Sequence, residues 1–296
     1  MNISKVIALG GTIFLLLGSA FGCAKPAAPD SVEYNVYEIG SFESADGGQH
    51  TSEYPLWDPD MLNYHQAATV AKEASVTFNG QTYTGQYDLS SVQIPNTYVS
   101  HRYTVQYDDG KVIWFSINSA TGELASIWFI SKDLVIESAT EAECRKIADE
   151  LAKVYIPLSE YCVKTDEQEQ SYIYTYYREV NGYPTSDQVH IAVKKNGTIA
   201  SFGTFMLGAF EGVKSISIDE NKASEAVEKK MDTIYASTVG DKSFEIKDKQ
   251  LVKLENEKIA VLYTVDVEIV RDDIDQDGTK RQIQSGSLLQ LILSIT

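Results

Sequence analysis

One stretch of the chain has the residue types and the spacing of a metal site, Asp273-Ile274-Asp275-Gln276-Asp277-Gly278. Asp273, Asp275 and Asp277 alternate ahead of a glycine, as the oxygen ligands do at the start of a calcium-binding loop. The place of the closing bidentate glutamate holds Gln284 instead. A solvated hairpin tip would use the same residues. The sequence therefore leaves two alternatives, weak Ca²⁺ binding and a polar turn, of which we favour the turn.

Catalytic spacing is missing from the rest of the sequence. The four histidines are scattered, at His50, His65, His101 and His190. No His-Glu-x-x-His helix, Gly-x-Ser-x-Gly elbow or phosphate-binding glycine loop occurs. Cys144 or Cys162 would need a neighbouring histidine to act as a nucleophile, and the spacing places none. We therefore expect no enzymatic activity, with an envelope hydrolase whose site the motifs do not reveal as one alternative.

Aromatic residues form the other candidate binding surface. Tyr172, Tyr174 and Tyr176 have one parity along a predicted strand, and Trp114 and Trp128 occupy neighbouring strands. Such residues can bind a peptide or a sugar, because they give a large contact area at little cost in side-chain entropy. The same tyrosine row could instead cover a sheet beneath a helix. We favour the second interpretation, in which the row belongs to a core, with the binding surface as the alternative.

Helices are predicted where apolar residues recur at helical intervals. The clearest covers about residues 139–155, where Thr140 and Glu143 have the spacing of a capping box. A second covers about 219–236, and a weaker candidate runs over about 59–75. Each is followed by alternating strands. The repeated order of helix and strands predicts an α+β fold, made of repeated units of one helix packed on an antiparallel β-sheet.

The central strands carry strong turn signals. Tyr172 to Val180 leads into Asn181-Gly182, and a β-branched strand around Val189 to Val193 leads into Asn196-Gly197 and Thr198-Ile199. Asn-Gly between alternating runs indicates a hairpin, because both residues can adopt positive φ.

This order of an aromatic strand, Arg178, an Asn-Gly turn, a β-branched strand and a glycine-led strand resembles the PepSY-type domain, which is similar to the propeptide modules of thermolysin-like proteases. The resemblance covers residues 134–212, is weaker over 213–296 and is faintest over 58–133. Pro184 after the turn and Cys144 in the helix depart from the family pattern. The resemblance implies a non-catalytic module outside the membrane that restrains a protease or senses conditions at the envelope. It supplies no catalytic residues to carry over.

The amino terminus has the layout of an export signal. Lys5 precedes the apolar run Val6 to Leu17, which is short for a membrane span, and small residues lead to Cys23. This layout resembles the signal of a bacterial lipoprotein, which implies removal of residues 1–22 and acylation of Cys23. Ala20-Phe21-Gly22 departs from the usual lipoprotein pattern and would also serve as an ordinary cleavage site. We expect a protein anchored to the outer face of a bacterial membrane, with a secreted soluble form as the alternative.

Export bears on the two remaining cysteines. Cys144 and Cys162 could form a disulfide in an oxidising compartment, or they could be two buried thiols. Both alternatives stay open at the level of sequence.

Charge and length narrow the class of partner. The chain has 296 residues with 25 Lys and Arg against 42 Asp and Glu, a formal net charge of −17. Such a surface disfavours nucleic acid and anionic lipid as partners, so membrane attachment would depend on the acyl chains. The predicted division is a signal peptide (1–22), a tether and extension (23–57), a first α+β unit (58–133), a PepSY-like unit (134–212) and a third unit (213–296).

Together these observations predict a non-catalytic lipoprotein that binds or regulates a protein or peptide at the cell envelope, a protease among the candidates. No cofactor is expected beyond the Ca²⁺ alternative. A solute- or glycan-binding lipoprotein and an envelope hydrolase are the other two hypotheses.

Overall fold

The computed structural model describes residues 34–41, 70–93, 98–131, 136, 138–254, 258–274 and 280–295. The strands, in chain order, are β1 (Asn35–Ser41), β2 (Glu73–Phe78), β3 (Gln81–Gln93), β4 (Tyr98–Gln106), β5 (Val112–Asn118), β6 (Leu124–Ile130), β7 (Cys162–Glu167), β8 (Ser171–Val180), β9 (Tyr183–Lys194), β10 (Ile199–Phe205), β11 (Asp241–Lys253), β12 (Ile259–Ile274) and β13 (Lys280–Ser294). The helices are α2 (Glu141–Ala152), the short 3₁₀ turn η1 (Leu158–Glu160) and α3 (Glu220–Ile234).

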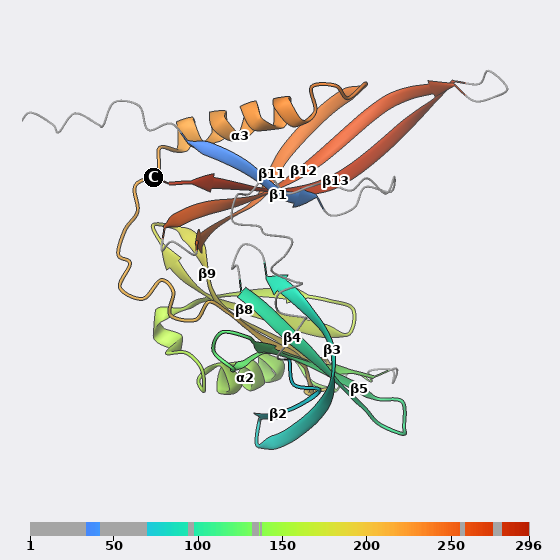
Figure 1. Ribbon diagram of the computed structural model, residues 1–296, viewed down its shortest axis with the longest axis vertical. Coiled ribbons are helices and arrows are strands. Elements are labelled where there is room, and N and C mark those ends of the chain that lie inside the picture. The colour runs from blue at the N-terminus through green and yellow to red at the C-terminus, as the bar shows by residue number, and fades with distance from the viewer. Residues whose placement is uncertain are drawn as a thin grey trace, which may run out of the picture. The chain divides into compact units, whose positions relative to one another are not determined.

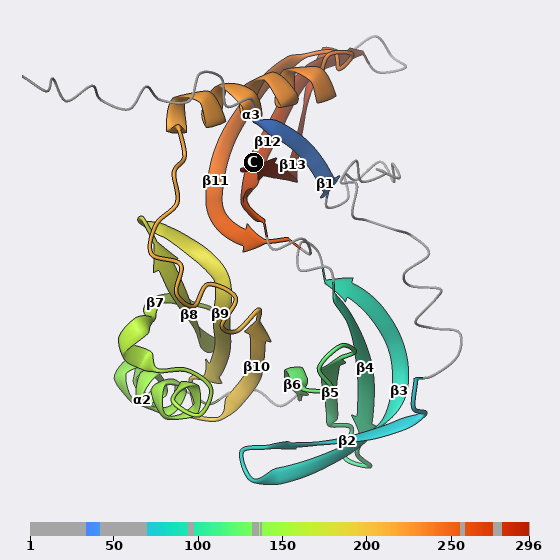
Figure 2. The same ribbon diagram turned by 60° about the vertical axis from the view of Figure 1, so that its left-hand side comes forward.

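The strands pair in the order β1-β13-β12-β11-β9-β10-β6-β5-β4-β3-β2, while β8 pairs with β9 and β7 pairs with β8 (Figures 1 and 2). The described pairs are antiparallel with one exception. Strands β9 and β11 run parallel where Thr185 lies opposite Leu251. The sheet is therefore mixed.

The predicted fold class was wrong. Within the described residues, two α-helices accompany 13 strands, and those strands join in one mixed sheet instead of forming repeated helix-on-sheet units. The physical reason lies in the strand edges, which leave unpaired backbone groups that another strand can satisfy. Strand β10 takes β6 as its second partner, and β9 reaches β11. Alternating hydrophobicity predicts a strand, but it does not say which edges meet.

Helix α2 forms where its capping box predicts. The Glu143 amide donates to Thr140 Oγ1 at 3.3 Å, and the Thr140 amide donates to Glu143 Oε2 at 2.8 Å. This reciprocal pair satisfies two amides that the first turn leaves without helical partners. The helix buries Cys144, Ala148 and Leu151 on the face that packs against β8 and β9. The predicted capping box is confirmed.

Helix α3 is also confirmed, with Asp219 as its N-cap and Ala223, Val227 and Met231 buried along one face. It packs against β1 and β13, as Figure 1 shows. The predicted helix at 59–75 falls mostly outside the described residues, and its end is wrong, since Glu73–Phe78 forms β2. Over the described part of the chain, no helix combines the length and the apolar character that a bilayer crossing requires.

The predicted Asn-Gly hairpin is confirmed in the central strands. Asn181 and Gly182 both adopt positive φ, 53° and 81°, between β8 and β9. Beneath α2, the core includes Phe115, Ile127 and Phe202, each at most 1% exposed. Full burial of a side chain of this size contributes about 1.5–3 kcal/mol. A second core lies beneath α3.

Candidate functional site

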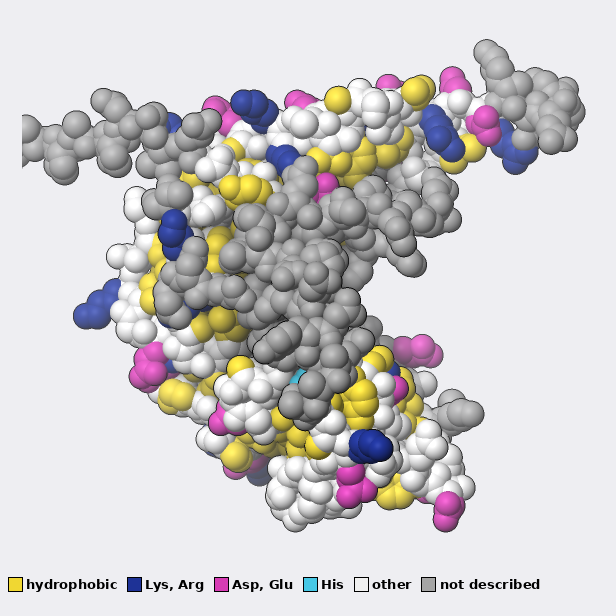
Figure 3. Space-filling view, viewed as in Figure 1, with side chains coloured by type: hydrophobic (Ala, Val, Ile, Leu, Met, Phe, Trp, Pro, Cys, Tyr) yellow, Lys and Arg dark blue, Asp and Glu magenta, His cyan; other side chains and the backbone are white. Residues whose placement is uncertain are grey.

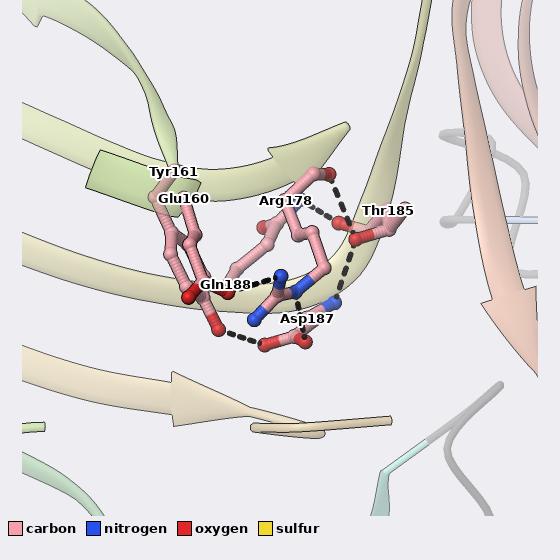
Figure 4. Close-up of polar contacts among 6 residues, drawn as sticks. All are labelled: Glu160, Tyr161, Arg178, Thr185, Asp187 and Gln188. Atoms are coloured by element: carbon pink, nitrogen blue, oxygen red, sulfur yellow. Dashed lines mark hydrogen bonds and ion pairs between the residues drawn. The ribbon is translucent and has the colours of Figure 1, made fainter. Parts of the chain in front are cut away.

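A polar cluster with a buried centre joins η1, β8 and β9. We call it the Arg178 cluster, and Figure 4 shows its members, Glu160, Tyr161, Arg178, Thr185, Asp187 and Gln188. The Tyr161 hydroxyl donates to Asp187 Oδ1 at 2.6 Å, and Arg178 Nε donates to Asp187 Oδ2 at 3.2 Å. Arg178 Nη1 also pairs with Glu160 Oε2 at 2.8 Å. Asp187 has no exposed surface.

Four consecutive polar residues of β9, 185–188, are buried, which breaks the alternation typical of a strand. Two of them bond to side chains, Asp187 to Tyr161 and Arg178 and Ser186 to Met206, and the other two bond to backbone carbonyls. Thr185 Oγ1 donates to the Arg178 carbonyl at 2.9 Å, and Gln188 Nε2 donates to the Thr185 carbonyl at 2.7 Å. Gln250 Nε2 on β11 donates to the same carbonyl at 3.2 Å. The cluster therefore fixes the β8–β9 hairpin and its junction with β11.

The electrostatics of the Arg178 cluster favour a structural role. Burial raises the pKa of Tyr161, and its hydrogen bond to Asp187 raises that pKa further. Burial alone would lower the pKa of Arg178, but hydrogen bonds to Glu160 and Tyr161 raise it above its usual range. Near neutral pH the phenol keeps its proton and the guanidinium keeps its charge. Both carboxylate oxygens of Asp187 already accept hydrogen bonds, so this buried group is not placed to receive a proton from a substrate.

The tyrosine row lies in the core beneath α2. Tyr174 and Tyr176 are 0% and 1% exposed. The Tyr176 hydroxyl donates to Asp149 Oδ1 at 2.7 Å, and the Tyr174 hydroxyl donates to the Glu141 carbonyl at 3.1 Å, so both phenols bond to α2. Tyr172, at the end of the row, is half-buried, and its ring lies 5.4 Å from Lys195 Nζ. Tyr174 and Tyr176 are therefore inaccessible to a ligand.

The two tryptophans are direct cross-strand partners on β5 and β6. Trp128 is 53% exposed, whereas Trp114 is half-buried. The Arg102 guanidinium lies 4.8 Å from the Trp114 ring centroid and pairs with Asp88 at 2.6 Å. The aromatic candidates therefore differ in exposure: Tyr174 and Tyr176 are buried, Tyr172 and Trp114 are half-buried, and Trp128 is exposed.

The other candidate residues lie apart from one another. Cys144 and Cys162 are both free thiols, the first buried and the second exposed, so no disulfide joins them. Burial raises the pKa of the Cys144 thiol, which donates to the Lys194 carbonyl at 3.5 Å.

The predicted calcium loop and the predicted acylation site are only partly covered by the structure. Asp273 is exposed near the end of β12, opposite Arg281 of β13. Asp275, Asp277 and Cys23 lie outside the described residues. In the part of the chain that the structure describes, no three His, Cys, Asp or Glu side chains gather in a way that could hold a metal ion.

An open cleft between β6 and β10 is the feature that the sequence did not reveal. The two strands pair at three positions and stop where Ser201 lies opposite Trp128. Continuing that register would place Ile199 opposite Ile130, yet both of these residues line a cleft of about 590 Å³. The β9–β10 register shifts between Ile199 and Ser201, and a bulge of this kind bends a strand. We call this hollow the β6–β10 cleft.

The walls of the β6–β10 cleft are largely apolar. Tyr83, Tyr107 and Phe129 contribute aromatic surface, and Lys194 contributes an amine. A neighbouring hollow of about 330 Å³ shares Tyr83 and Phe129 and reaches Ile147 of α2. On the face in Figure 3, hydrophobic side chains lie among charged side chains of both signs. Turn signals predicted the strands on both sides of the cleft, but no signal in the sequence indicated that β6 and β10 stop pairing at this point.

Comparison with known proteins gives a partial match. A family model described as the YcdB, YcdC repeated domain matches residues 71–204, a span that includes β6 and all of β10 except its last residue. The C-terminal domain of Bacillus megaterium YpeB is structurally similar over 80% of this chain and 100% of its own, with 10% identity and a TM-score of 0.35. An uncharacterized protein from Eubacterium rectale matches over 64% and 72%, with 13% identity and a TM-score of 0.29.

The complex of MucA and MucB from Pseudomonas aeruginosa gives a weaker structural match, with 9% identity and a TM-score of 0.11, over 75% of this chain and 85% of that one. TM-scores this low do not assign a function. No curated protein matches the sequence. Over residues 71–204 the chain is therefore similar to the YcdB, YcdC repeated domain.

Proposed function

We propose that this chain is a non-catalytic, extracytoplasmic bacterial protein that binds a protein or peptide in the β6–β10 cleft. The observation that carries the proposal is the contrast between the two kinds of site. Asp187, at the centre of the Arg178 cluster, is buried and accepts hydrogen bonds on both carboxylate oxygens, whereas the cleft is open, largely apolar and placed where two strands stop pairing. A surface of this kind suits recognition.

The N-terminal prediction completes the proposal. Acylation of Cys23 would hold the protein at the outer face of the membrane, where a partner at the envelope, a protease among the candidates, would be within reach. The PepSY resemblance of residues 134–212 supports a regulatory role. The division at 134 and 213 and the calcium alternative at Asp273, Asp275 and Asp277 stay predictions.

Site-specific photo-crosslinking in cells tests the proposal. A photoreactive phenylalanine analogue at Thr198, an exposed residue that lines the cleft, should capture a specific protein partner from intact envelopes. The same analogue at Thr165, an exposed residue of β7, is the matched control. Identical products from both positions, or none from Thr198, would contradict the proposal.

A second candidate function, glycan binding, has its own supporting observation. Trp114 lines a separate cleft of about 700 Å³ together with Gln86, Thr104 and Gln106. An aromatic wall beside amide and hydroxyl groups suits a sugar, which offers an apolar ring face and a polar rim. Calorimetry with soluble cell-wall oligosaccharides tests this alternative. Binding that is lost in Trp114→Ala and kept in Trp128→Ala would support it, and the absence of heat in both proteins would exclude it.

A further inference from the structure

We infer that the β6–β10 cleft accepts an extended peptide as an added strand, and that this peptide has a run of consecutive apolar residues beside a carboxylate. The inference rests on the proposed function and specifies the chemistry of the partner. It depends on three features of the cleft. These are the strand register where β6 and β10 stop pairing, the apolar side chains on both faces of the sheet, and the half-buried amine of Lys194.

The strand register leaves Ile130 of β6 and Ile199 of β10 unpaired with each other. Ile130 pairs with Val112 on the β5 side, and Ile199 pairs with Val193 on the β9 side. Among the described strand pairs, none joins Ile130 to Ile199 across the cleft. The ends of β6 and β10 therefore face each other across open space. An extended peptide can add its backbone to such an edge, and the backbone hydrogen bonds supply affinity whatever its side chains are.

The side chains along β6 indicate which peptide would fit. Phe129 and Ile130 are neighbours on a strand, so they point to opposite faces of the sheet, and both line the cleft. Ile113 and Val112 continue these two faces on β5. Both faces of the cleft are therefore apolar. A peptide lying between them meets apolar surface on each side, which favours consecutive apolar residues over an alternating pattern.

Three charged residues line the cleft, Asp109, Lys111 and Lys194, and Lys194 is half-buried. Lys111, in the same cleft, pairs with Asp109 at 2.7 Å, and the neighbouring Lys195 pairs with Glu167 at 2.9 Å. No acidic partner of Lys194 is found among the described residues. An ammonium that is partly withdrawn from water is stabilised by an opposite charge, so the peptide should bring a carboxylate, either from Asp or Glu or from its own C-terminus.

Fluorescence anisotropy with the full-length protein tests the ligand chemistry. The probes are fluorescein-labelled hexapeptides with four central positions drawn from Val, Ile, Leu and Phe. One set ends in Asp and is C-terminally amidated, one ends in Asn and is amidated, and one ends in Asn with a free C-terminus. We expect at least one acidic set to bind about tenfold more tightly than the neutral set. The two acidic sets distinguish a side-chain carboxylate from a terminal one.

Four variants, two of them controls, test whether the peptide binds in the cleft. Lys194→Gln should remove the tenfold preference while neutral peptides bind as before. Lys164→Gln makes the same change in net charge on exposed β7 and should keep the preference. Thr198→Trp, which fills the cleft, should abolish binding of all three sets, and Thr165→Trp should not. Melting curves of the four variants show whether each is folded.

The strand geometry has its own test. Peptide binding should slow amide hydrogen exchange at residues 129–131 and 198–199. The peptide that binds most tightly is then N-methylated either at its odd positions or at its even positions. One of these two peptides should lose binding and the other should keep it, because an added strand forms hydrogen bonds to its neighbour through alternate residues. Equal effects in both peptides, or protection elsewhere, would overturn the inference while leaving the proposed function intact.

Two other results would also overturn it. If no peptide binds although the photoreactive residue at 198 captures a protein, the cleft recognises a folded surface and only the proposed function survives. If the protein forms a dimer that Thr198→Trp dissociates, the occupant is a second copy of the chain. Failure of the crosslinking as well would remove the proposed function together with the inference.

Discussion

The Tyr161 hydroxyl donates to the Asp187 carboxylate across 2.6 Å, and Asp187 has no exposed surface. This contact connects the turn after α2 with the middle of β9. Arg178 supplies the balancing charge from β8 at 3.2 Å. A buried carboxylate with this many partners makes the fold depend on each of them, which leads to the first prediction.

Asp187→Asn should lower the free energy of unfolding by about 1.5–3 kcal/mol, because it weakens the charged hydrogen bonds that Asp187 accepts from Tyr161 and Arg178, while Glu160 still pairs with Arg178. Urea denaturation followed by circular dichroism measures the loss. Asp109→Asn, which breaks an exposed pair with Lys111, is the control and should change little. Equal losses in the two variants would contradict a structural role for the Arg178 cluster.

The stability of the protein should fall on acidification partly through His190. Burial lowers the pKa of this histidine below its usual 6.5, although the nearby Asp166 opposes the shift. The unfolded chain then binds more protons than the folded one, so stability is present above about pH 6.5 and is lost as the pH falls towards the lowered pKa. Thermal melting from pH 7.5 to 5 should show a shallower decline for His190→Gln. A steeper decline in that variant would contradict the prediction.

Tyr176→Phe should cost about 1.5–3 kcal/mol of stability, since it removes the hydrogen bond to the charged Asp149 beneath α2. Tyr172→Phe, at the half-buried end of the same row, should cost much less. Chemical denaturation of both variants makes the comparison. If Tyr176→Phe were neutral for stability but reduced partner binding, the row would be a recognition surface after all.

Gly85→Ala should destabilise the protein by about 1–3 kcal/mol through overpacking. A Cβ atom at Gly85 would lie 2.9 Å from Phe115 Cε1 and 3.1 Å from Tyr103 Cβ, both in the core. Gly203→Ala is the matched control in another strand, where the nearest atoms would lie at 3.7 Å. Denaturation midpoints of the two variants should differ clearly. Similar midpoints would show that the side chains around Phe115 can shift to accommodate the added Cβ atom.

In a Cys23→Ser background, one thiol should react with a thiol reagent in the folded protein and a second only after unfolding. The exposed Cys162 accounts for the first. Burial protects Cys144 and raises its pKa, which lowers the reactive thiolate fraction. Absorbance during labelling, with and without denaturant, counts the thiols. Finding none after unfolding without a reductant would show that the two cysteines form a disulfide.

Local features of this protein were determined by the sequence alone. The capping box of Thr140 and Glu143 and the positive φ values at Asn181 and Gly182 depend on residues within a few positions, so pattern and propensity were sufficient. The buried face of α3 followed from helical periodicity in the same way.

Tertiary structure decided how the strands associate and which polar groups lie inside. The parallel contact of Thr185 with Leu251 and the stop in pairing at Trp128 and Ser201 each join segments more than 60 residues apart. Asp187 lies within a strand, and only the folded chain brings the side chains of Tyr161 and Arg178 to its carboxylate. Strand periodicity specifies which face of a strand is apolar. Which strand edges pair with each other depends on contacts between segments that are far apart in the sequence. The candidate cleft lies where β6 and β10 stop pairing, so it could be found only in the folded structure.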